Sequence, residues 1–206
     1  MKNHFVFDFD DTISSSYEHN QNLFYETFLP YCPDIDETVV RRIHRENRGP
    51  SLNFLFALVI DELKLKNLDA DKLTEENEQL HVKKYKKMTL FNGVEKLFEI
   101  LKNKDKEISI CTNRQYDSLN AMIDHRGLRK YLDNIISCKD EGFEKPDPTC
   151  LIKLVEDSRK DKSEFIYFGD SKTDFEFATN AGMDFVIVDQ YLNGKNFYDM
   201  IIKAFL

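Results

Sequence analysis

The residues that could do chemistry stand in four places, three of them directly after a short apolar segment and one in the segment that follows such a run. Residues 8–12 hold carboxylates and a hydroxyl, and residues 112–114 hold polar side chains. The third place is a single lysine, Lys145, and the fourth is the acidic stretch 170–174. Carboxylates dominate this set. The possible chemistry therefore depends on which positive charge could neutralise these carboxylates.

The carboxylates of Asp8, Asp10 and Asp170, with Asp174 as a fourth, would repel one another if they shared one crevice. Each close pair costs about 4 kcal/mol at an effective dielectric constant of about 20. Such a cluster is stable only if protons or a cation neutralise it. Carboxylate oxygens, without a thiolate or an imidazole in the set, favour Mg²⁺. We therefore predict a magnesium site formed by these residues, next to the positive charge of Lys145.

The apolar segments before these residues predict the elements that position them. Residues 4–9 form an apolar, β-prone run, and four similar runs indicate further strands at residues 107–111, 134–138, 164–168 and 184–188. Helical patterns lie between them, at residues 94–101, 114–124 and 171–180, after Pro148 and at the C-terminal end. This alternation predicts an α/β fold with a Rossmann-like parallel sheet and right-handed crossovers.

The polar places follow the predicted strands, and ligands of parallel α/β sheets bind at the carboxyl ends of the strands. We therefore expect the polar side chains to meet at one rim of the sheet. A rim that combines a divalent cation, a lysine and a threonine hydroxyl such as that of Thr112 is typical of a phosphate-handling site.

Residues 14–88 show a helical pattern without a convincing strand, and they separate the first strand from the others. Leu52, Leu55, Phe56 and Val59 lie at i, i+3, i+4 and i+7, the spacing of an amphipathic helix. The sequence thus predicts an α/β core of residues 1–13 and 89–206 with an inserted all-helical domain of residues 14–88.

Composition excludes several classes of partner. The chain has 206 residues and a formal net charge of -8, so we expect neither nucleic acid nor an anionic membrane as a partner. The longest apolar stretch, around residues 52–60, is too short to span a bilayer, and the first residues have no signal-peptide pattern. We expect a cytoplasmic protein, a monomer or weak dimer, with four reduced cysteines.

Four segments together resemble the motifs of the haloacid dehalogenase (HAD) superfamily. Residues 5–12 are similar to its first motif, an apolar strand followed by DxDxT, and residues 108–112 to its second, a strand ending in Thr or Ser. Residues 145–148 (KPDP) resemble the third motif and residues 169–174 (GDSKTD) the fourth. The resemblance covers essentially the whole chain, and residues 14–88 stand where the family has its helical C1 cap. Asp11 departs from the pattern, because the family usually has glycine there.

The resemblance implies a phosphatase that acts through an aspartyl-phosphate. In that mechanism Asp8 is the nucleophile, and Asp10 protonates the leaving group and then activates water. The backbone carbonyl of Asp10 would also bind the metal. Dehalogenases of the superfamily lack this second acid, so Asp10 favours phosphoryl transfer over cleavage of a carbon–halogen bond. The substrate class implied is a small phosphorylated metabolite.

The resemblance also implies that the remaining motif residues bind the phosphoryl group or the metal, or balance charge. The hydroxyl of Thr112 and the backbone N–H of Asn113 would bind phosphoryl oxygens, and Lys145 would balance charge between phosphate and nucleophile. Asp170 resembles the metal ligand of the family. Asp174 resembles its partner acid, which either binds the metal directly or orients Lys145 or a metal-bound water.

Two other functions remain open from the sequence. A phosphomutase of the same superfamily would carry a histidine at the cap hinge, and His19 stands one position out of register, which favours hydrolysis. A receiver-like phospho-accepting module also combines acids, a threonine and a lysine, but there the acceptor follows a later strand. Arg48 in the insertion could reach the leaving group or lie on a solvated helix face. Arg114 could contact phosphate or merely flank Thr112.

Overall fold

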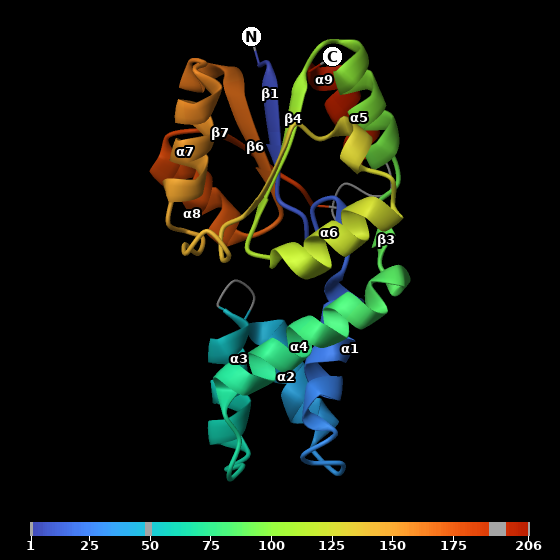
Figure 1. Cartoon of the computed structure of the whole chain (residues 1–206), viewed down its shortest axis with the longest axis vertical. Helices are drawn as coiled ribbons and strands as arrows, with labels where there is room; N and C mark the ends of the chain where they lie inside the picture. The colour runs from blue at the N-terminus through green and yellow to red at the C-terminus, as the bar shows by residue number, and fades with distance from the viewer. Residues whose placement is uncertain (1, 48–50, 190–196, 206) are drawn as a thin grey trace. The chain divides into compact units, whose positions relative to one another are not determined.

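A computed structural model describes residues 2–47, 51–189 and 197–205, and Arg48 lies outside these ranges. The chain divides into two compact units, one formed by Met1–Ser15 with Met88–Leu206 and the other by Ser16–Lys87. Each unit is described separately below (Figure 1). The predicted α/β core with an inserted helical domain is confirmed.

A parallel sheet with the strand order β5-β4-β1-β6-β7 forms the centre of the first unit. Its strands are β1 (His4–Phe7), β4 (Glu107–Thr112), β5 (Asn134–Ser137), β6 (Phe165–Gly169) and β7 (Asp184–Ile187). The first strand, β1, lies in the middle, hydrogen-bonded to β4 on one side and β6 on the other. Every residue of β1 is buried, which explains why residues 5–7 are all apolar rather than alternating with polar residues.

Helices cover both faces of the sheet (Figure 1). The face that includes Val6 and Tyr167 packs against α7 (Thr149–Ser158) and α8 (Lys172–Ala181). The opposite face packs against α5 (Val94–Asn103), where the rings of Phe7 and Phe98 lie 5.2 Å apart. The unit also contains α6 (Tyr116–His125), α9 (Phe197–Phe205) and two short 3₁₀ turns, η2 (Arg129–Tyr131) and η3 (Lys162–Glu164).

The second unit consists of four packed helices within the described residues. They are α1 (Tyr17–Phe28), α2 (Glu37–Glu46), α3 (Leu52–Glu62) and α4 (Ala70–Lys84), followed by the 3₁₀ turn η1 (Tyr85–Lys87). The side chains of Asp36, Ser51 and Asp69 cap the N-termini of α2, α3 and α4. An aromatic core holds the helices together, and its centre is the stacked pair Phe24 and Phe56.

The structure differs from the expected elements at the ends of the insertion. Residues 14–15 form a short strand, β2 (Ser14–Ser15), which pairs antiparallel with β3 (Thr89–Leu90). This pair was not predicted, because strands of two residues are too short to show a periodic pattern. The first strand of the core sheet ends at Phe7 rather than at residue 9.

The four cysteines are free thiols, as expected. Cys111, Cys138 and Cys150 are buried in one core cluster, and the sulfur atoms of Cys111 and Cys138 lie 3.5 Å apart. Over the ranges that the structure covers, no helix has the length and apolar character needed to cross a membrane.

Candidate active site

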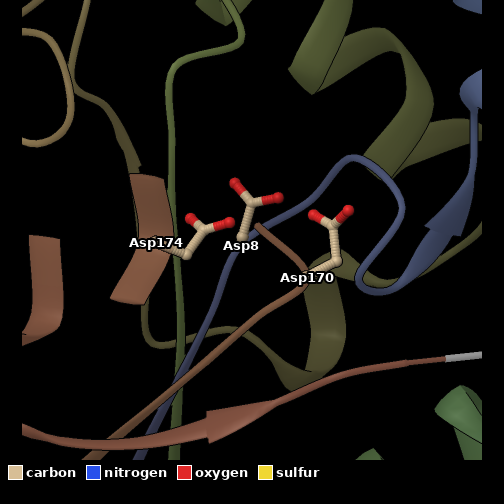
Figure 2. Close-up of side chains that lie close together, drawn as sticks. All are labelled: Asp8, Asp170 and Asp174. Carbon is tan, nitrogen blue, oxygen red and sulfur yellow. The ribbon is translucent and has the colours of Figure 1, made fainter. Parts of the chain in front are cut away.

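Three carboxylates from two strand ends meet at the carboxyl edge of the sheet. Asp8 follows β1, Asp170 follows β6, and Asp174 lies in the first turn of α8. One oxygen of each lies within 4.8 Å of the other two, and Figure 2 shows the three side chains next to one another. The donor set is entirely carboxylate, which fits a hard divalent cation. The predicted convergence of Asp8, Asp170 and Asp174 is therefore present.

The register of the sheet explains why these acids meet. Phe7 pairs with Phe168 on the neighbouring strand, and the backbone N–H of Asp8 donates to the carbonyl of Phe168 at 2.8 Å. The two strands end at the same edge of the sheet. The acids that follow them, Asp8 and Asp170, therefore face the same space. Gly169 is required there, because a Cβ atom at this position would collide with the side chain of Asp174.

Lys145 occupies the centre of the charge cluster. Its Nζ atom donates to Oδ1 of Asp8 at 2.6 Å, to Oδ1 of Asp174 at 2.9 Å and to the hydroxyl of Tyr167 at 2.6 Å. All four side chains are buried. A buried ammonium group is stable only if its donors are satisfied, and these three acceptors meet that requirement.

The pKa values follow from burial and these contacts. Burial raises the pKa of Asp8 to about 7, although Lys145 opposes the rise. Burial also opposes the charge on Lys145, but Asp174 and Asp8 hold its pKa above the ordinary value. For Asp174 burial is outweighed by Lys145 and by a hydrogen bond from Ser171, so its pKa is lowered. Asp174 is thus a firmly ionised partner of Lys145, whereas Asp8 needs further positive charge to be ionised well below neutral pH.

Asp174 is also part of the start of α8. Its Oδ2 atom accepts hydrogen bonds from the backbone N–H of Ser171 at 3.2 Å and from the hydroxyl of Ser171 at 2.5 Å. The hydroxyl of Ser171 in turn accepts from the backbone N–H of Asp174, which completes a capping box. The helix start therefore fixes the carboxylate that holds Lys145.

Thr112 and Asn113 end β4 at the same edge. Thr112 is 2% exposed, and its Oγ1 atom accepts from the backbone N–H of Arg114 at 3.3 Å. The side-chain carbonyl of Asn113 accepts from the backbone N–H of Lys145 at 3.0 Å. Asn113 therefore ties the segment that carries Lys145 to the end of β4.

Asp10 has a different partner from the other acids. Its Oδ1 atom accepts from Nη2 of Arg114 at 2.7 Å and its Oδ2 atom from Nε at 2.8 Å, a two-bond ion pair. The side chain of Asp10 is not one of the three clustered carboxylates. Of the two expectations for Arg114, contact with phosphate or a place beside Thr112, neither included this ion pair.

Asp11 adopts a backbone conformation that normally favours glycine. Its φ angle is 53°, in the left-handed region, where aspartate is tolerated better than most residues. This explains why a position with glycine in the resembling family can hold aspartate here.

Tyr167 is a site residue that the sequence did not predict. Its hydroxyl contacts Lys145, the carbonyl of Cys111 at 3.0 Å and Oδ1 of Asp174 at 3.1 Å. In the sequence it stands within an aromatic strand, FIYF, where it reads as a core residue. The alternation of the strand could have placed it beside Val6 and Cys111, but not beside Lys145.

Comparison with known proteins relates this geometry to a family. The profile of the haloacid dehalogenase-like hydrolases matches residues 5–188. A phosphoglycolate phosphatase of Rhodobacter capsulatus is 33% identical over 101 residues, 48% of this chain and 44% of that enzyme, so the match spans less than half of the relative. A pyrophosphatase PpaX of Listeria monocytogenes is 25% identical over 181 residues, 85% of this chain and 78% of the relative.

Solved structures share the fold. CbbY from Rhodobacter sphaeroides in complex with phosphate has a TM-score of 0.75 and 18% identity, and the match covers 91% of this chain and 86% of CbbY. A HAD-superfamily hydrolase of subfamily IA from Geobacter sulfurreducens has a TM-score of 0.68 and 21% identity, with 90% and 86% covered. At these identities the structures show the fold alone. Because the family profile matches most of its length, the chain belongs to the haloacid dehalogenase-like hydrolases.

Proposed function

We propose that this hydrolase is a Mg²⁺-dependent phosphatase that cleaves a small phosphomonoester through an aspartyl-phosphate on Asp8. The observation that carries the proposal is the position of Asp8. It lies at the end of the central strand, within hydrogen-bonding distance of the buried Lys145 and beside the carboxylates of Asp170 and Asp174. The family favours this enzyme over the receiver-like module.

The proposed reaction has two steps. A carboxylate oxygen of Asp8 attacks phosphorus, the bond between phosphorus and the leaving oxygen breaks, and Asp10 gives that oxygen a proton. Water then attacks the phosphorus, Asp10 takes a proton from the water, and the bond to Asp8 breaks. Inorganic phosphate leaves, and both aspartates return to their starting forms.

The residues that would hold the cation are Asp8 and Asp170 through their carboxylates and Asp10 through its backbone carbonyl. The ion supplies positive charge that keeps Asp8 ionised and shields it from the phosphate dianion. We infer that Asp174 acts mainly through Lys145, because both of its oxygens already accept hydrogen bonds from Lys145, Tyr167 or Ser171.

The phosphoryl oxygens would be bound by the hydroxyl of Thr112 and the backbone N–H of Asn113, both at the end of β4. Lys145 would balance the charge of the phosphoryl group against that of Asp8. The helical unit, Ser16–Lys87, is the proposed cap that selects the leaving group. Arg48 is a candidate contact, but it lies outside the described residues.

The substrate class rests on similarity. The relatives include a phosphoglycolate phosphatase and a pyrophosphatase, and the similar fold of CbbY was solved with phosphate. A small phosphorylated metabolite is therefore the proposed substrate. The phosphomutase alternative predicts transfer of phosphate between two positions of a sugar, without release.

The test is a screen of phosphorylated metabolites with Mg²⁺, in which released inorganic phosphate is measured for the wild type and for Asp8→Asn. We expect phosphate release by the wild type, its loss in Asp8→Asn, and its loss after treatment with EDTA, restored by added Mg²⁺. Equal rates for wild type and Asp8→Asn would refute the assigned nucleophile. Rates that EDTA leaves unchanged would remove the metal from the mechanism.

A further inference from the structure

We propose that Arg114 is a positioning residue that holds the carboxylate of Asp10 in its working orientation, an inference that rests on the proposed function. The guanidinium and the carboxylate meet in parallel, with N–O distances of 2.7 and 2.8 Å. Such two-bond pairs fix the plane of the carboxylate as well as its place.

Asp10 needs such a partner because of where it lies. It stands in the loop after β1 rather than on the strand, and its side chain is 27% exposed. A carboxylate on a loop has several rotamers available, whereas proton transfer needs one oxygen aimed at the reacting oxygen. The contact with Arg114 restricts this freedom, and each oxygen keeps a second lone pair outside the fork that can carry the proton.

Arg114 is itself well fixed. Its side chain is 5% exposed, and Nη1 donates to the hydroxyl of Ser118 at 3.3 Å. Its backbone N–H donates to Oγ1 of Thr112. Through its guanidinium and its backbone, Arg114 therefore links Asp10 to the first turn of α6 and the end of β4. A site built this way places its acid more accurately than a loop alone could.

Direct binding of phosphate by Arg114 is the competing role, and the two roles predict different kinetics. A phosphate ligand acts equally on every phosphate ester, and its loss raises KM. A residue that aims the proton donor matters most when the leaving group needs a proton. Alkoxide leaving groups need one, whereas p-nitrophenolate leaves readily without one.

The experiment compares Arg114→Ala and Arg114→Lys with the wild type on two substrates, p-nitrophenyl phosphate and the alkyl phosphate that the wild type hydrolyses fastest. For Arg114→Ala we expect kcat to fall about 100-fold on the alkyl phosphate and less than about tenfold on p-nitrophenyl phosphate, with KM changed less than about threefold. Arg114→Lys keeps the charge but not the fork, so we expect an intermediate loss.

Arg129→Ala is the matched control. Arg129 also makes a two-bond pair with an aspartate, Asp124, at 2.5 and 3.2 Å, but both side chains are exposed. Its loss should leave both rates unchanged. Circular dichroism and thermal unfolding of each variant separate a loss of fold from a loss of orientation.

A double-mutant cycle tests whether Arg114 acts through Asp10. In the Asp10→Asn background, Arg114→Ala should lower the remaining rate less than twofold. Equal losses on both substrates with a raised KM, or full additivity with Asp10→Asn, would overturn the positioning role and leave the phosphatase proposal intact. Absence of phosphate release by the wild type would instead overturn the proposed function, and this role with it.

Discussion

The two ends of the central sheet both bury polar side chains, but they satisfy them in different ways. His4 is the first residue of β1, and Asp8 directly follows the last. Both side chains are almost inaccessible to solvent. At the amino end the buried group is held neutral. At the carboxyl end it is held among charges. The same strand therefore carries a structural polar network at one end and the proposed active site at the other.

The amino end is a hydrogen-bonded network around a neutral imidazole, whose Nδ1 atom lies 3.0 Å from the partly exposed carboxylate of Glu107. Nε2 of His4 lies 2.7 Å from the hydroxyl of Ser109, and the side-chain amide of Asn134 donates to the same hydroxyl at 3.1 Å. The imidazole stacks on Phe165 with ring centroids 4.5 Å apart. Burial lowers the pKa of His4 to about 4, despite the nearby Glu107, so the ring is neutral at pH 7. Such a network costs little, because neutral groups are cheaper to bury than charges.

The carboxyl end keeps charges that a purely structural core would avoid. Asp8, Asp174 and Lys145 could be replaced by apolar residues with a neutral or favourable effect on stability, if stability were the only requirement. The contrast indicates that buried charges, rather than burial of polar groups as such, distinguish the proposed active-site end of this sheet from the amino end.

The largest expected effect is that of a substitution at Asp8, at the carboxyl end of the sheet. Asp8→Asn removes the proposed nucleophile, so we expect kcat to fall by about 10⁴-fold or more. The amide oxygen can still accept from Lys145, so the temperature of thermal unfolding should change by no more than a few degrees. Both are measured on one preparation, by phosphate release and by calorimetry. An unfolded variant would mean that the charge cluster is structural as well.

The next effect tests the neutral end through pH. Unfolded histidine binds its proton near pH 6.5, and native His4 near pH 4. The unfolded chain therefore binds more protons between these values, so His4 lowers the free energy of unfolding as pH falls from 6.5 to 4, by about 3 kcal/mol in total. Above pH 6.5 the side chain of His4 is neutral in both the folded and the unfolded chain, so this loss of stability is absent.

Urea unfolding at several pH values would measure this for the wild type and for His4→Gln, which can still bond to Ser109. The difference between the two proteins should grow in favour of the variant as pH falls. A constant difference across this range would contradict a neutral, buried His4.

A smaller effect is expected for Tyr167, which contacts Lys145 at the carboxyl end of the sheet. Tyr167→Phe removes one acceptor of Lys145 and leaves Asp8 and Asp174, so we expect kcat to fall about tenfold and KM to change little. Tyr116→Phe is the control, because its hydroxyl bonds to Glu141 at 3.1 Å, outside the charge cluster. Steady-state kinetics of both variants measure this difference. Equal kcat values for the two variants would show that the hydroxyl of Tyr167 does not contribute to turnover.

The smallest effect concerns the backbone beside the carboxyl end of the sheet. Asp11→Gly relieves the left-handed conformation of Asp11 and removes a negative charge. We expect the free energy of unfolding to rise by about 0.5 kcal/mol, with kcat unchanged. Urea unfolding measures the change. A loss of stability would indicate that the side chain of Asp11 makes a contact worth more than the strain.

Much of the site was predictable because the sheet is parallel. Once residues 4–9 and 164–168 are assigned to strands, Asp8 and Asp170 must leave from the same edge, and the structure places them there. The five strands of the parallel sheet were predicted to within two residues at either end, because each contains a short apolar run.

What could not be predicted depends on non-local contacts. The hydroxyl of Tyr167 meets Lys145 only because the loop after β5 returns to the centre of the sheet. The partner of Arg114 depends on the path of the loop after β1, which no periodic pattern describes. The assignment of roles to Thr112 and Asn113 stays a prediction.

The small antiparallel pair β2–β3 has a consequence for how the chain is assembled. Ser15 and Thr89 are directly opposite partners, so their Cα atoms are about 5 Å apart although the whole helical unit separates them in sequence. Topologically, that unit is a very long hairpin loop. A two-residue turn such as Asn-Gly could span the same gap. The α/β unit therefore needs only that the two ends of the inserted segment lie close together, so inserts of different length could join it at this junction.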